Sequence, residues 1–558
     1  MDISQIVSNF LGLVAGVGIF MVACETLSKN LQAISSKKLK ALFSKVSNNK
    51  IVGVCIGALT TMLIQSSGAT TVMVIGFVNT NIISLNQAAT IILGSEIGTT
   101  LTGQIVALGM FGEQTISLTA IFATLVGVGA FLDIAAKKDK TKSIAGVMIG
   151  FGMIFVGLSS MSSSMNSFAQ LEILKEFIAT IKSPVLLIFI GAIFTALIQS
   201  SSAMTTIAIT MIAAGLINIE QGIYITLGAN VGSCVTGALA ALTSGTSAKR
   251  TSIFQLMFNI GGVVLVAVVD GLIKLATNSN LSFGIMIAEA FPNIPSTQLA
   301  MFHTIFNVAT VLIALPFSNM LVSICNKLIK ESEDDNAGSK LYYFDENMMS
   351  TPAVAVAIIK NEIINMADIA IKNFNIAIDT IINLDFSKNK EFETNEDELD
   401  YLNTTLVVII AKLSKLVTSA SDTSYLSSSY RVISDLERIG DYSENIIEYA
   451  DYLQKSEQKF TDVAIKEIEE VRNTVNELYT ASITVYTHYD EARMNDAFEL
   501  EEKIDDLTEK MSNNHIVRMN KGECNADVGA QYLQLSSDVE RIADHLININ
   551  DKDYITIN

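Results

Sequence analysis

The chain has 558 residues, which is too long for a single domain. Charge divides it unevenly: residues 1–330 hold 17 Lys/Arg and 11 Asp/Glu, a net of +6, and residues 331–558 hold 20 and 45, a net of −25, which together give the formal net charge of −19. The acidity of the second part excludes nucleic acid and anionic lipid as its partners. The five cysteines are odd in number and scattered, so no disulfide framework is expected.

The first part consists of apolar runs of about 20 residues, the length that crosses roughly 30 Å of hydrocarbon. The second part has the helical periodicity of a soluble domain. We therefore expect an all-α fold: a polytopic membrane domain over residues 1–330, a linker over 331–352 and a cytoplasmic helical domain over 353–558.

The membrane part contains an internal repeat. Residues 57–108 align with residues 191–242 at an offset of 134 without a gap, and 21 of the 52 positions are identical. The matches include the polar pair Gln65 and Gln199, which chance similarity between apolar segments would not produce. Such repeats are the hallmark of secondary transporters. We place repeat one at about 5–135, repeat two at about 143–275, and a final span at 297–325.

The basic loops determine the predicted topology, because Lys and Arg favour the cytoplasmic side. With the N-terminus outside and the tail inside, every basic loop is cytoplasmic if the chain crosses at about 6–27, 85–109, 115–135, 143–163, 222–243, 251–275 and 297–325. Segments 51–79 and 184–215 then enter and leave on one side as re-entrant hairpins. Each repeat has three crossings and one hairpin, so the second is inverted and the two hairpin tips are expected to meet near the midplane.

Both predicted tips carry Gln-Ser-Ser. A hairpin tip exposes helix N-terminal N–H groups, which attract anions, and C-terminal carbonyls, which coordinate Na⁺. Hydroxyl and amide groups can bind either kind of ion. The alternative is that these small residues only allow close helix packing, but packing requires neither the Gln nor the repetition. The candidate residues are Gln65, Ser66, Ser67 and Thr70 in repeat one and Gln199, Ser200, Ser201 and Ser202 in repeat two.

A second repeated motif pairs residues 94–100 with residues 228–234. Its glycines around a polar residue predict a break in the helix. A carboxylate deep in an apolar span is costly unless paired, so Glu96 is expected to ligate Na⁺, take up a proton, or pair with a backbone group. The remaining candidates are Thr99, Thr100, Asn230, Ser233 and Thr236. For His303 and Asn307, one turn apart on the last span, helix packing is favoured over ligation, and Asp270 is expected to pair with Lys274.

These doubled motifs resemble the sodium/phosphate cotransporter family over residues 5 to 325. The resemblance implies a dimeric inverted-repeat carrier in the plasma membrane of a bacterial-type cell, with the two Gln-Ser-Ser segments around phosphate and Na⁺. Two positions depart from the family pattern: Glu96 stands where relatives usually carry Asn, and Gly68 stands where the longer form has Ser.

The tail resembles a PhoU domain, a family of paired three-helix bundles linked to phosphate regulation. Six helices are predicted, at 353–384, 392–421, 424–456, 460–489, 491–521 and 525–549. Four E-x-x-x-D motifs each place two carboxylates on one helix face, and the resemblance implies iron or zinc binding there; surface ion pairing is the alternative. The motif residues are Glu396, Asp400, Glu437, Asp441, Glu501, Asp505, Glu540 and Asp544.

Together these observations predict sodium-coupled phosphate symport by alternating access, regulated by the tail. The alternative is a membrane-anchored phosphate sensor with little transport. An enzyme is disfavoured, because no nucleophile–base pair, Walker sequence or dinucleotide fingerprint is visible.

Overall fold

The computed structural model describes residues 3–43, 49–80, 82–110, 118–242, 244–278, 281–292, 294–330, 341–417, 419–488 and 490–550, and these residues form helices and connections without a strand. The chain divides into two compact units. The first comprises Met1–Ala337 and Asp345–Val354, and the second comprises Gly338–Phe344 and Ala355–Asn558. The predicted all-α fold is confirmed. Residues 331–340 of the expected linker lie outside the described residues.

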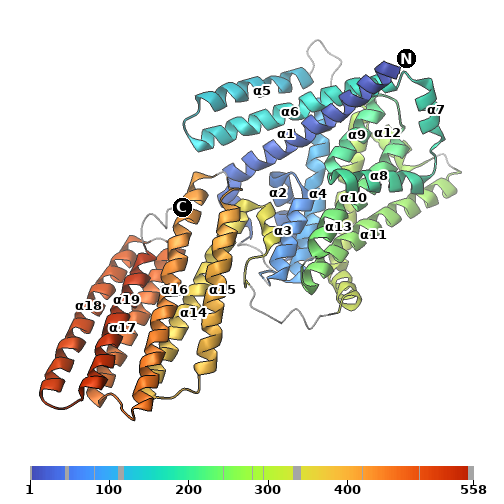
Figure 1. Cartoon of the computed structure of the whole chain (residues 1–558). Helices are drawn as coiled ribbons and strands as arrows, with labels where there is room; N and C mark the ends of the chain where they lie inside the picture. Colours follow the sequence, from blue (N-terminus) through green and yellow to red (C-terminus); the bar gives the residue numbers. More distant parts are fainter. Residues whose placement is uncertain are drawn as a thin grey trace. The chain divides into compact units, whose positions relative to one another are not determined.

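The first unit contains thirteen α-helices within its described residues. They are α1 (Ile3–Phe43), α2 (Lys50–Ile64), α3 (Ser67–Asn79), α4 (Leu85–Gly109), α5 (Leu118–Ala135), α6 (Asp139–Phe168), α7 (Glu172–Thr180), α8 (Pro184–Ile198), α9 (Ser201–Ala213), α10 (Ile219–Leu242), α11 (Thr246–Ala276), α12 (Phe283–Ala290) and α13 (Pro295–Leu328). Figure 1 shows their arrangement. The short helices α7 and α12 were not predicted.

Six described stretches are long and apolar enough to cross a membrane: Ser4–Ser35, Leu85–Gly109, Asp139–Phe168, Ile219–Leu242, Thr246–Ala276 and Pro295–Leu328. Helices α7 and α8 pass the same test together but are bent by 112°. The shorter apolar helices α2, α3, α5 and α9 include both arms of the first predicted hairpin and the second arm of the other. This distribution is that of a multi-pass membrane protein with interrupted segments.

Glycines let the first arm of each hairpin pack directly against the following long helix. A Cβ at Gly57 would lie 1.9 Å from the carbonyl oxygen of Ile91, and one at Gly94 would lie 2.0 Å from that of Val54. The α8–α10 pair repeats the arrangement, because a Cβ at Gly228 would lie 2.0 Å from the carbonyl oxygen of Ile188. Small residues of this kind allow helix backbones in membranes to approach closely.

The predicted break in the helix at residues 94–100 and 228–234 is wrong. Helices α4 and α10 run without interruption through both motifs. Sequence reasoning took the glycines as helix breakers, whereas in the structure they face the backbone of the preceding hairpin arm. The packing gained at these positions outweighs the roughly 1 kcal/mol that a mid-helix glycine costs relative to alanine.

A short 3₁₀ helix, η2 (Glu346–Ser350), packs on α3 within the first unit. Asn79 at the end of α3 donates to Asp345 Oδ2 at 2.8 Å and accepts from the Gly245 N–H at 2.9 Å. Met348 is fully buried, and a Cβ at Gly76 would lie 2.9 Å from its Cγ. The segment that precedes the second unit is thus anchored to the second arm of the first hairpin.

The second unit is a bundle of long helices (Figure 1). They are α14 (Pro352–Asn383), α15 (Asn389–Leu413), α16 (Ala420–Lys455), α17 (Asp462–Thr487), α18 (Glu491–Asn520) and α19 (Ala526–Asn548). The apolar residues Ile433, Leu436 and Ile439, spaced by three, are fully buried, as helical periodicity predicts. All six predicted helices are present, although α15 ends at Leu413 rather than at 421.

Candidate functional site

The two Gln-Ser-Ser segments form the same turn. Gln65 follows α2 with φ 56° and ψ 22°, and Gln199 follows α8 with φ 58° and ψ 26°. In each case the next residue is extended and caps the following helix: Ser66 Oγ accepts from the Ala69 N–H at 3.1 Å, and Ser200 Oγ accepts from the Ala203 N–H at 3.2 Å. A left-handed non-glycine residue costs about 1–2 kcal/mol, so the repeat preserves a strained turn in both halves.

Contacts from both repeats hold the first turn. The Thr102 hydroxyl of α4 donates to Gln65 Oε1 at 3.1 Å, and Gln65 Nε2 donates to the Met62 carbonyl at 2.6 Å. A Cβ at Gly68 would lie 3.3 Å from Thr236 of α10, which is the repeat equivalent of Thr102. The first tip therefore lies between the corresponding helices of the two repeats, as an inverted-repeat site requires.

The two turns expose different residues. Gln199 is exposed and Gln65 is half-buried, whereas Ser66 is exposed and Ser200 is half-buried. Ser201 is buried like its equivalent Ser67. Among the described residues, no hydrogen bond joins the two tips. The Ser202 carbonyl accepts from the Thr206 hydroxyl at 2.8 Å. The structure thus gives both tips one backbone geometry but different surroundings.

Glu96 is fully enclosed on α4 and is held by two amides of α11. Gln255 Nε2 donates to Glu96 Oε1 at 3.2 Å, and Asn259 Nδ2 donates to the same oxygen at 3.1 Å. All three side chains are at most 2% exposed. Among the described residues, no hydrogen bond joins Glu96 to either tip. Its partners are therefore amide side chains, not a backbone group.

Asn230, the repeat equivalent of Glu96, has a corresponding environment on α13. Its Nδ2 donates to Asn307 Oδ1 at 3.1 Å, and its Oδ1 lies 3.2 Å from His303 Nε2. Sequence reasoning favoured helix packing for His303 and Asn307, and the structure shows that both also bond to a candidate site residue.

Four of the other predicted hydroxyls bond within their own helices or hairpin. Thr99 donates to the Ser95 carbonyl at 3.0 Å, Thr100 to the Ile97 carbonyl at 2.8 Å, and Ser233 to the Asn230 carbonyl at 2.7 Å. The Thr61 hydroxyl donates to the Thr70 hydroxyl at 3.0 Å, which joins the two arms of the first hairpin. The predicted pair of Asp270 and Lys274 is confirmed at 2.8 Å.

Sequence reasoning missed Gln255 and Asn259. The available signal was their spacing: two amides at i and i+4 fall on one face of an otherwise apolar span. His303 and Asn307 show the same spacing on the last span. A search for repeated polar pairs on apolar helices would have found both.

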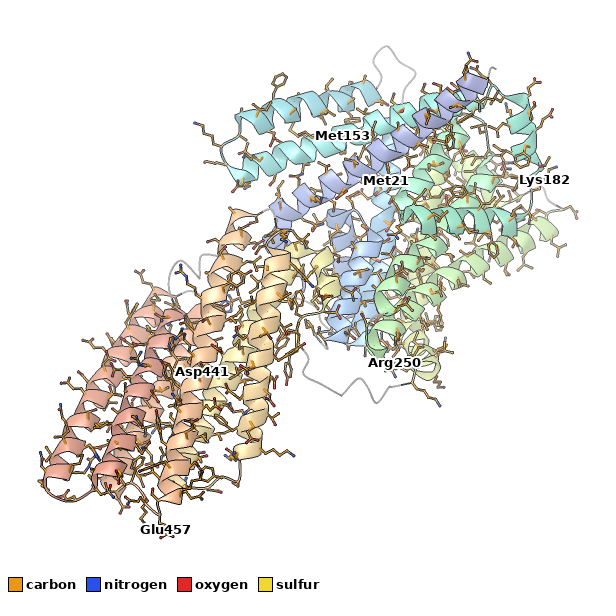
Figure 2. The ribbon with its side chains drawn as sticks, viewed as in Figure 1. Met21, Met153, Lys182, Arg250, Asp441 and Glu457 are labelled. Atoms are coloured by element: carbon orange, nitrogen blue, oxygen red, sulfur yellow. The ribbon has the colours of Figure 1, made fainter. Side chains whose placement is uncertain are left out.

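The predicted carboxylates of the second unit gather in two groups. On α15 and α16, burial raises the pKa of Glu396 to about 7, and the charges of Asp400 and Asp441 add to that increase. Burial and the charge of Asp400 also raise the pKa of Asp441, whose place on α16 is labelled in Figure 2. On α18 and α19, burial raises the pKa of Glu540, with Asp505 and Asp544 adding to it.

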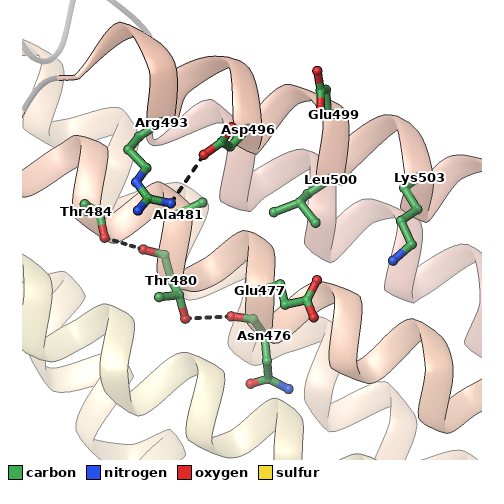
Figure 3. Close-up of a pocket in the computed structure, with 10 residues that line it drawn as sticks. All are labelled: Asn476, Glu477, Thr480, Ala481, Thr484, Arg493, Asp496, Glu499, Leu500 and Lys503. Atoms are coloured by element: carbon green, nitrogen blue, oxygen red, sulfur yellow. Dashed lines mark hydrogen bonds and ion pairs between the residues drawn. The ribbon is translucent and has the colours of Figure 1, made fainter.

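Carboxylates on facing helices of a bundle can hold metal ions. Within the described ranges, however, no group of three or more His, Cys, Asp or Glu side chains is placed to hold a metal ion. A pocket lies elsewhere, between α17 and α18, with a volume of about 780 Å³ (Figure 3). Its Arg493 pairs with Asp496 at 3.3 Å, and both are exposed. It lies outside the membrane unit, so we do not assign it to transport.

The fold and the repeated turns define a multi-pass membrane protein built on a duplicated helical unit. The sequence profile of the Na⁺/Pi-cotransporter family matches residues 19–163 and 157–288, and that of the PhoU domain matches residues 363–450 and 468–552. The chain belongs to the Na⁺/Pi-cotransporter family and carries a C-terminal PhoU domain. The family resemblance seen in the sequence is therefore confirmed.

Named relatives cover the chain to different extents. The Salmonella typhimurium protein named "Putative inorganic phosphate export protein YjbB" is 22% identical over 539 residues, which covers 96% of this chain and 95% of the relative. The Homo sapiens sodium-dependent phosphate transport protein 2B is 35% identical over 98 residues, 17% of this chain and 14% of the relative. The uncharacterized Bacillus subtilis protein YqeW is 27% identical over 311 residues, 56% of this chain and 95% of the relative. No solved structure matches the chain.

Proposed function

We propose that this protein is a sodium-coupled inorganic phosphate carrier that works by alternating access. The observation that carries the proposal is the repeated turn: Gln65 and Gln199 have the same left-handed backbone, and each is followed by a serine that caps the next helix. Two helix N-termini and four serine hydroxyls would bind a phosphate without a Lys or Arg, and nearby carbonyl and amide oxygens would bind Na⁺.

The substrate site in this proposal combines the two tips with polar residues of α4 and α10. It comprises Gln65, Ser66, Ser67, Thr70, Glu96, Thr99, Thr100, Gln199, Ser200, Ser201, Ser202, Asn230, Ser233 and Thr236. The approach of Gly68 to Thr236 supports the part of this site at the first tip. Movement of one repeat-built half relative to the other would expose the site alternately to each side.

The names of the relatives support phosphate as the substrate. One name refers to export, and another refers to dependence on sodium without giving a direction. Transport of ³²P-labelled phosphate by the full chain in proteoliposomes tests both the substrate and the direction of transport. We expect net flux in the direction of an imposed Na⁺ gradient and no net flux when K⁺ replaces Na⁺. Absence of phosphate flux under any Na⁺ or pH gradient would refute the proposal.

Substitution of the two serines that cap α3 and α9 tests the role of the tips in transport. We expect Ser66→Ala combined with Ser200→Ala to abolish phosphate flux. Each cap contributes about 1 kcal/mol to its helix, so thermal melting of the detergent-purified protein must show that the variant is folded. Ser159→Ala is the control, because that serine lies outside the proposed site.

A membrane-anchored phosphate sensor is the second candidate, supported by the PhoU domain. Deletion of residues 355–558 discriminates between the two, because it removes the second unit but keeps the segment anchored on α3. Retained flux with altered regulation favours a carrier with a regulatory tail. Negligible flux in the full chain, with signalling lost on deletion, favours the sensor.

We also propose the topology that the charge pattern implies and the assembly that the family resemblance implies. The N-terminus would be outside, the second unit cytoplasmic, and the functional form a homodimer in the plasma membrane. Many large apolar side chains of the first unit are exposed, including Phe131 at 78% and Ile134 at 84%. Lipid and a second subunit are the partners that such surfaces require. Cysteine accessibility at each end tests the orientation.

The carboxylate groups of the second unit would bind iron or zinc, as the PhoU resemblance implies. Burial and neighbouring carboxylates raise the pKa values of Glu396, Asp441 and Glu540, and a bound cation would offset the repulsion between these charges. The metal content of the purified full chain, measured by plasma mass spectrometry, is expected to fall on Asp400→Asn with Asp505→Asn. Equal metal content in both proteins would contradict the assignment.

A further inference from the structure

Two buried polar clusters occupy equivalent places in the two repeats. The Glu96 cluster consists of Thr71, Glu96, Gly237, Gln255 and Asn259. The Asn230 cluster consists of Asn230, Gly103, His303 and Asn307, with Thr205 assigned to it by the repeat offset alone. Three members correspond at the repeat offset of 134: Thr71 with Thr205, Glu96 with Asn230, and Gly103 with Gly237. In each cluster the remaining two are polar side chains at i and i+4 on a neighbouring helix, α11 or α13.

Several oxygens of the Glu96 cluster lack a hydrogen-bond partner. Gln255 Oε1, Asn259 Oδ1 and Thr71 Oγ1 are all buried and unpartnered. Gln255 Oε1 and Thr71 Cγ2 each lie 3.0 Å from the position that a Cβ at Gly237 would occupy. The cluster therefore brings together side chains of α3, α4 and α11 beside a glycine of α10. A buried polar atom without a partner destabilises the fold, so this arrangement calls for a ligand.

The charge of the cluster indicates which ligand. Glu96 is the one carboxylate in it, and no ion pair among the described residues reaches Glu96. An ionised carboxylate enclosed in a membrane segment is costly without a counter-charge. If each amide group rotates by 180°, its oxygen takes the place of the nitrogen that now faces Glu96. The two amides then supply two neutral oxygen ligands for a cation beside the carboxylate. One negative charge among neutral oxygens matches one monovalent cation.

We infer that the Glu96 cluster is a binding site for a single dehydrated Na⁺, with Glu96, Gln255 and Asn259 as ligands and Thr71 as an additional oxygen donor. Without the ion, the amide N–H groups satisfy the carboxylate. With the ion, the amide oxygens replace them. Because Thr71 is on α3, the ion would join the second arm of the first hairpin to α4 and α11. This inference deepens the proposed function and rests on it only for the link to phosphate.

The Asn230 cluster is the internal comparison. It has the same equivalent positions, but an amide stands in place of the carboxylate. It also has unpartnered buried atoms, Thr205 Oγ1 and His303 Nδ1, but no negative charge to offset that of a cation. We therefore assign the cation to the Glu96 cluster alone.

The test measures Na⁺ binding without phosphate. The thermal midpoint of the detergent-purified full chain is followed as NaCl replaces KCl at constant ionic strength, since a ligand that binds the folded state raises the midpoint. We expect a saturable rise for the natural protein. In Glu96→Gln the half-saturating Na⁺ concentration should increase at least tenfold. Gln255→Ala should increase it severalfold and is the second variant if Glu96→Gln fails to fold.

Gln104→Ala is the matched control. Gln104 is an amide on the same helix as Glu96, but it donates to the Thr304 hydroxyl of α13 at 2.7 Å and is outside the cluster. We expect its half-saturating Na⁺ concentration to equal that of the natural protein. An equal increase in this variant would attribute the effect to loss of helix packing and overturn the assignment.

Two further outcomes would overturn the inference. Unchanged Na⁺ dependence in both Glu96→Gln and Gln255→Ala would place the cation elsewhere. A midpoint that responds to pH but not to Na⁺, and loses that response in Glu96→Gln, would assign a proton to the site. The test separates this inference from the proposed function. If Na⁺ binding depends on Glu96 but the protein shows no phosphate flux, the proposed function fails and this inference holds.

Discussion

Substitution of Gly94 by alanine tests the close packing of α2 against α4. The added Cβ would lie 2.0 Å from the Val54 carbonyl oxygen and 2.7 Å from its carbon, whereas real Cβ contacts are essentially never below 3.0 Å. The two backbones must therefore separate by about 3.0 − 2.0 = 1.0 Å. A gap of that size forfeits about a quarter to a half of each dispersion contact. Overpacking of this kind costs about 1–3 kcal/mol.

Gly261→Ala is the matched control, because a Cβ there meets no atom within 4 Å. Alanine is favoured over glycine in a helix by about 0.5–1 kcal/mol. We expect the thermal midpoint of the purified protein to fall in Gly94→Ala and to stay level or rise in Gly261→Ala. Similar midpoints for the two variants would refute the packing argument. Gly228→Ala should reproduce the loss, because its Cβ would lie 2.0 Å from the Ile188 carbonyl oxygen.

Three further predictions concern single residues. Gln65→Gly relieves a left-handed backbone that costs about 1 kcal/mol but deletes the hydrogen bond to Thr102. We therefore expect an unchanged or higher thermal midpoint together with loss of phosphate flux. A stable variant with normal flux would contradict the role of the Gln65 amide. In the metal-free protein, burial raises the pKa of Glu396 to about 7, above the unfolded value of 4.5. The folded state then binds the extra proton, so stability measured in the presence of a chelator should fall as pH rises from about 4.5 to 7. Glu396→Gln should remove that part of the pH dependence, and identical profiles for the two proteins would argue against it. Glu467 accepts two hydrogen bonds from Arg518, at 2.9 Å and 3.1 Å. Because both side chains are largely buried, Glu467→Ala should lower the free energy of unfolding by about 3 kcal/mol, measured by chemical unfolding of the full chain. A loss below about 1 kcal/mol would show that solvent screens the pair.

Much of the fold follows from pattern. Hydropathy and the 134-residue offset predict the spans, and an apolar helix of only 15 residues, α8 (Pro184–Ile198), ends at its Gln-Ser-Ser turn as expected. The six helices of the second unit follow from apolar spacing. These features depend on local periodicity, which is present in the sequence itself.

The wrong and missed features depend on tertiary contacts. A glycine at 94 can break a helix or face another backbone, and only the position of α2 decides which. Gln255 and Asn259 acquire their importance from Glu96, 159 and 163 residues away in the chain. The i, i+4 spacing marks the two amides as a pair on an apolar span, but only the placement of α11 beside α4 shows that their partner is Glu96.

The glycine contacts between hairpin arms and long helices have a mechanical consequence. With backbone against backbone at Gly57 and Gly94, α2 cannot slide along α4 without a collision at the next residue that carries a Cβ. The same holds for α8 and α10 at Gly228. We therefore expect each first arm and its long helix to move as one rigid piece in the proposed alternating-access cycle. The displacement that opens the tips would then occur elsewhere, for example where the Thr236 side chain of α10 approaches Gly68 of α3.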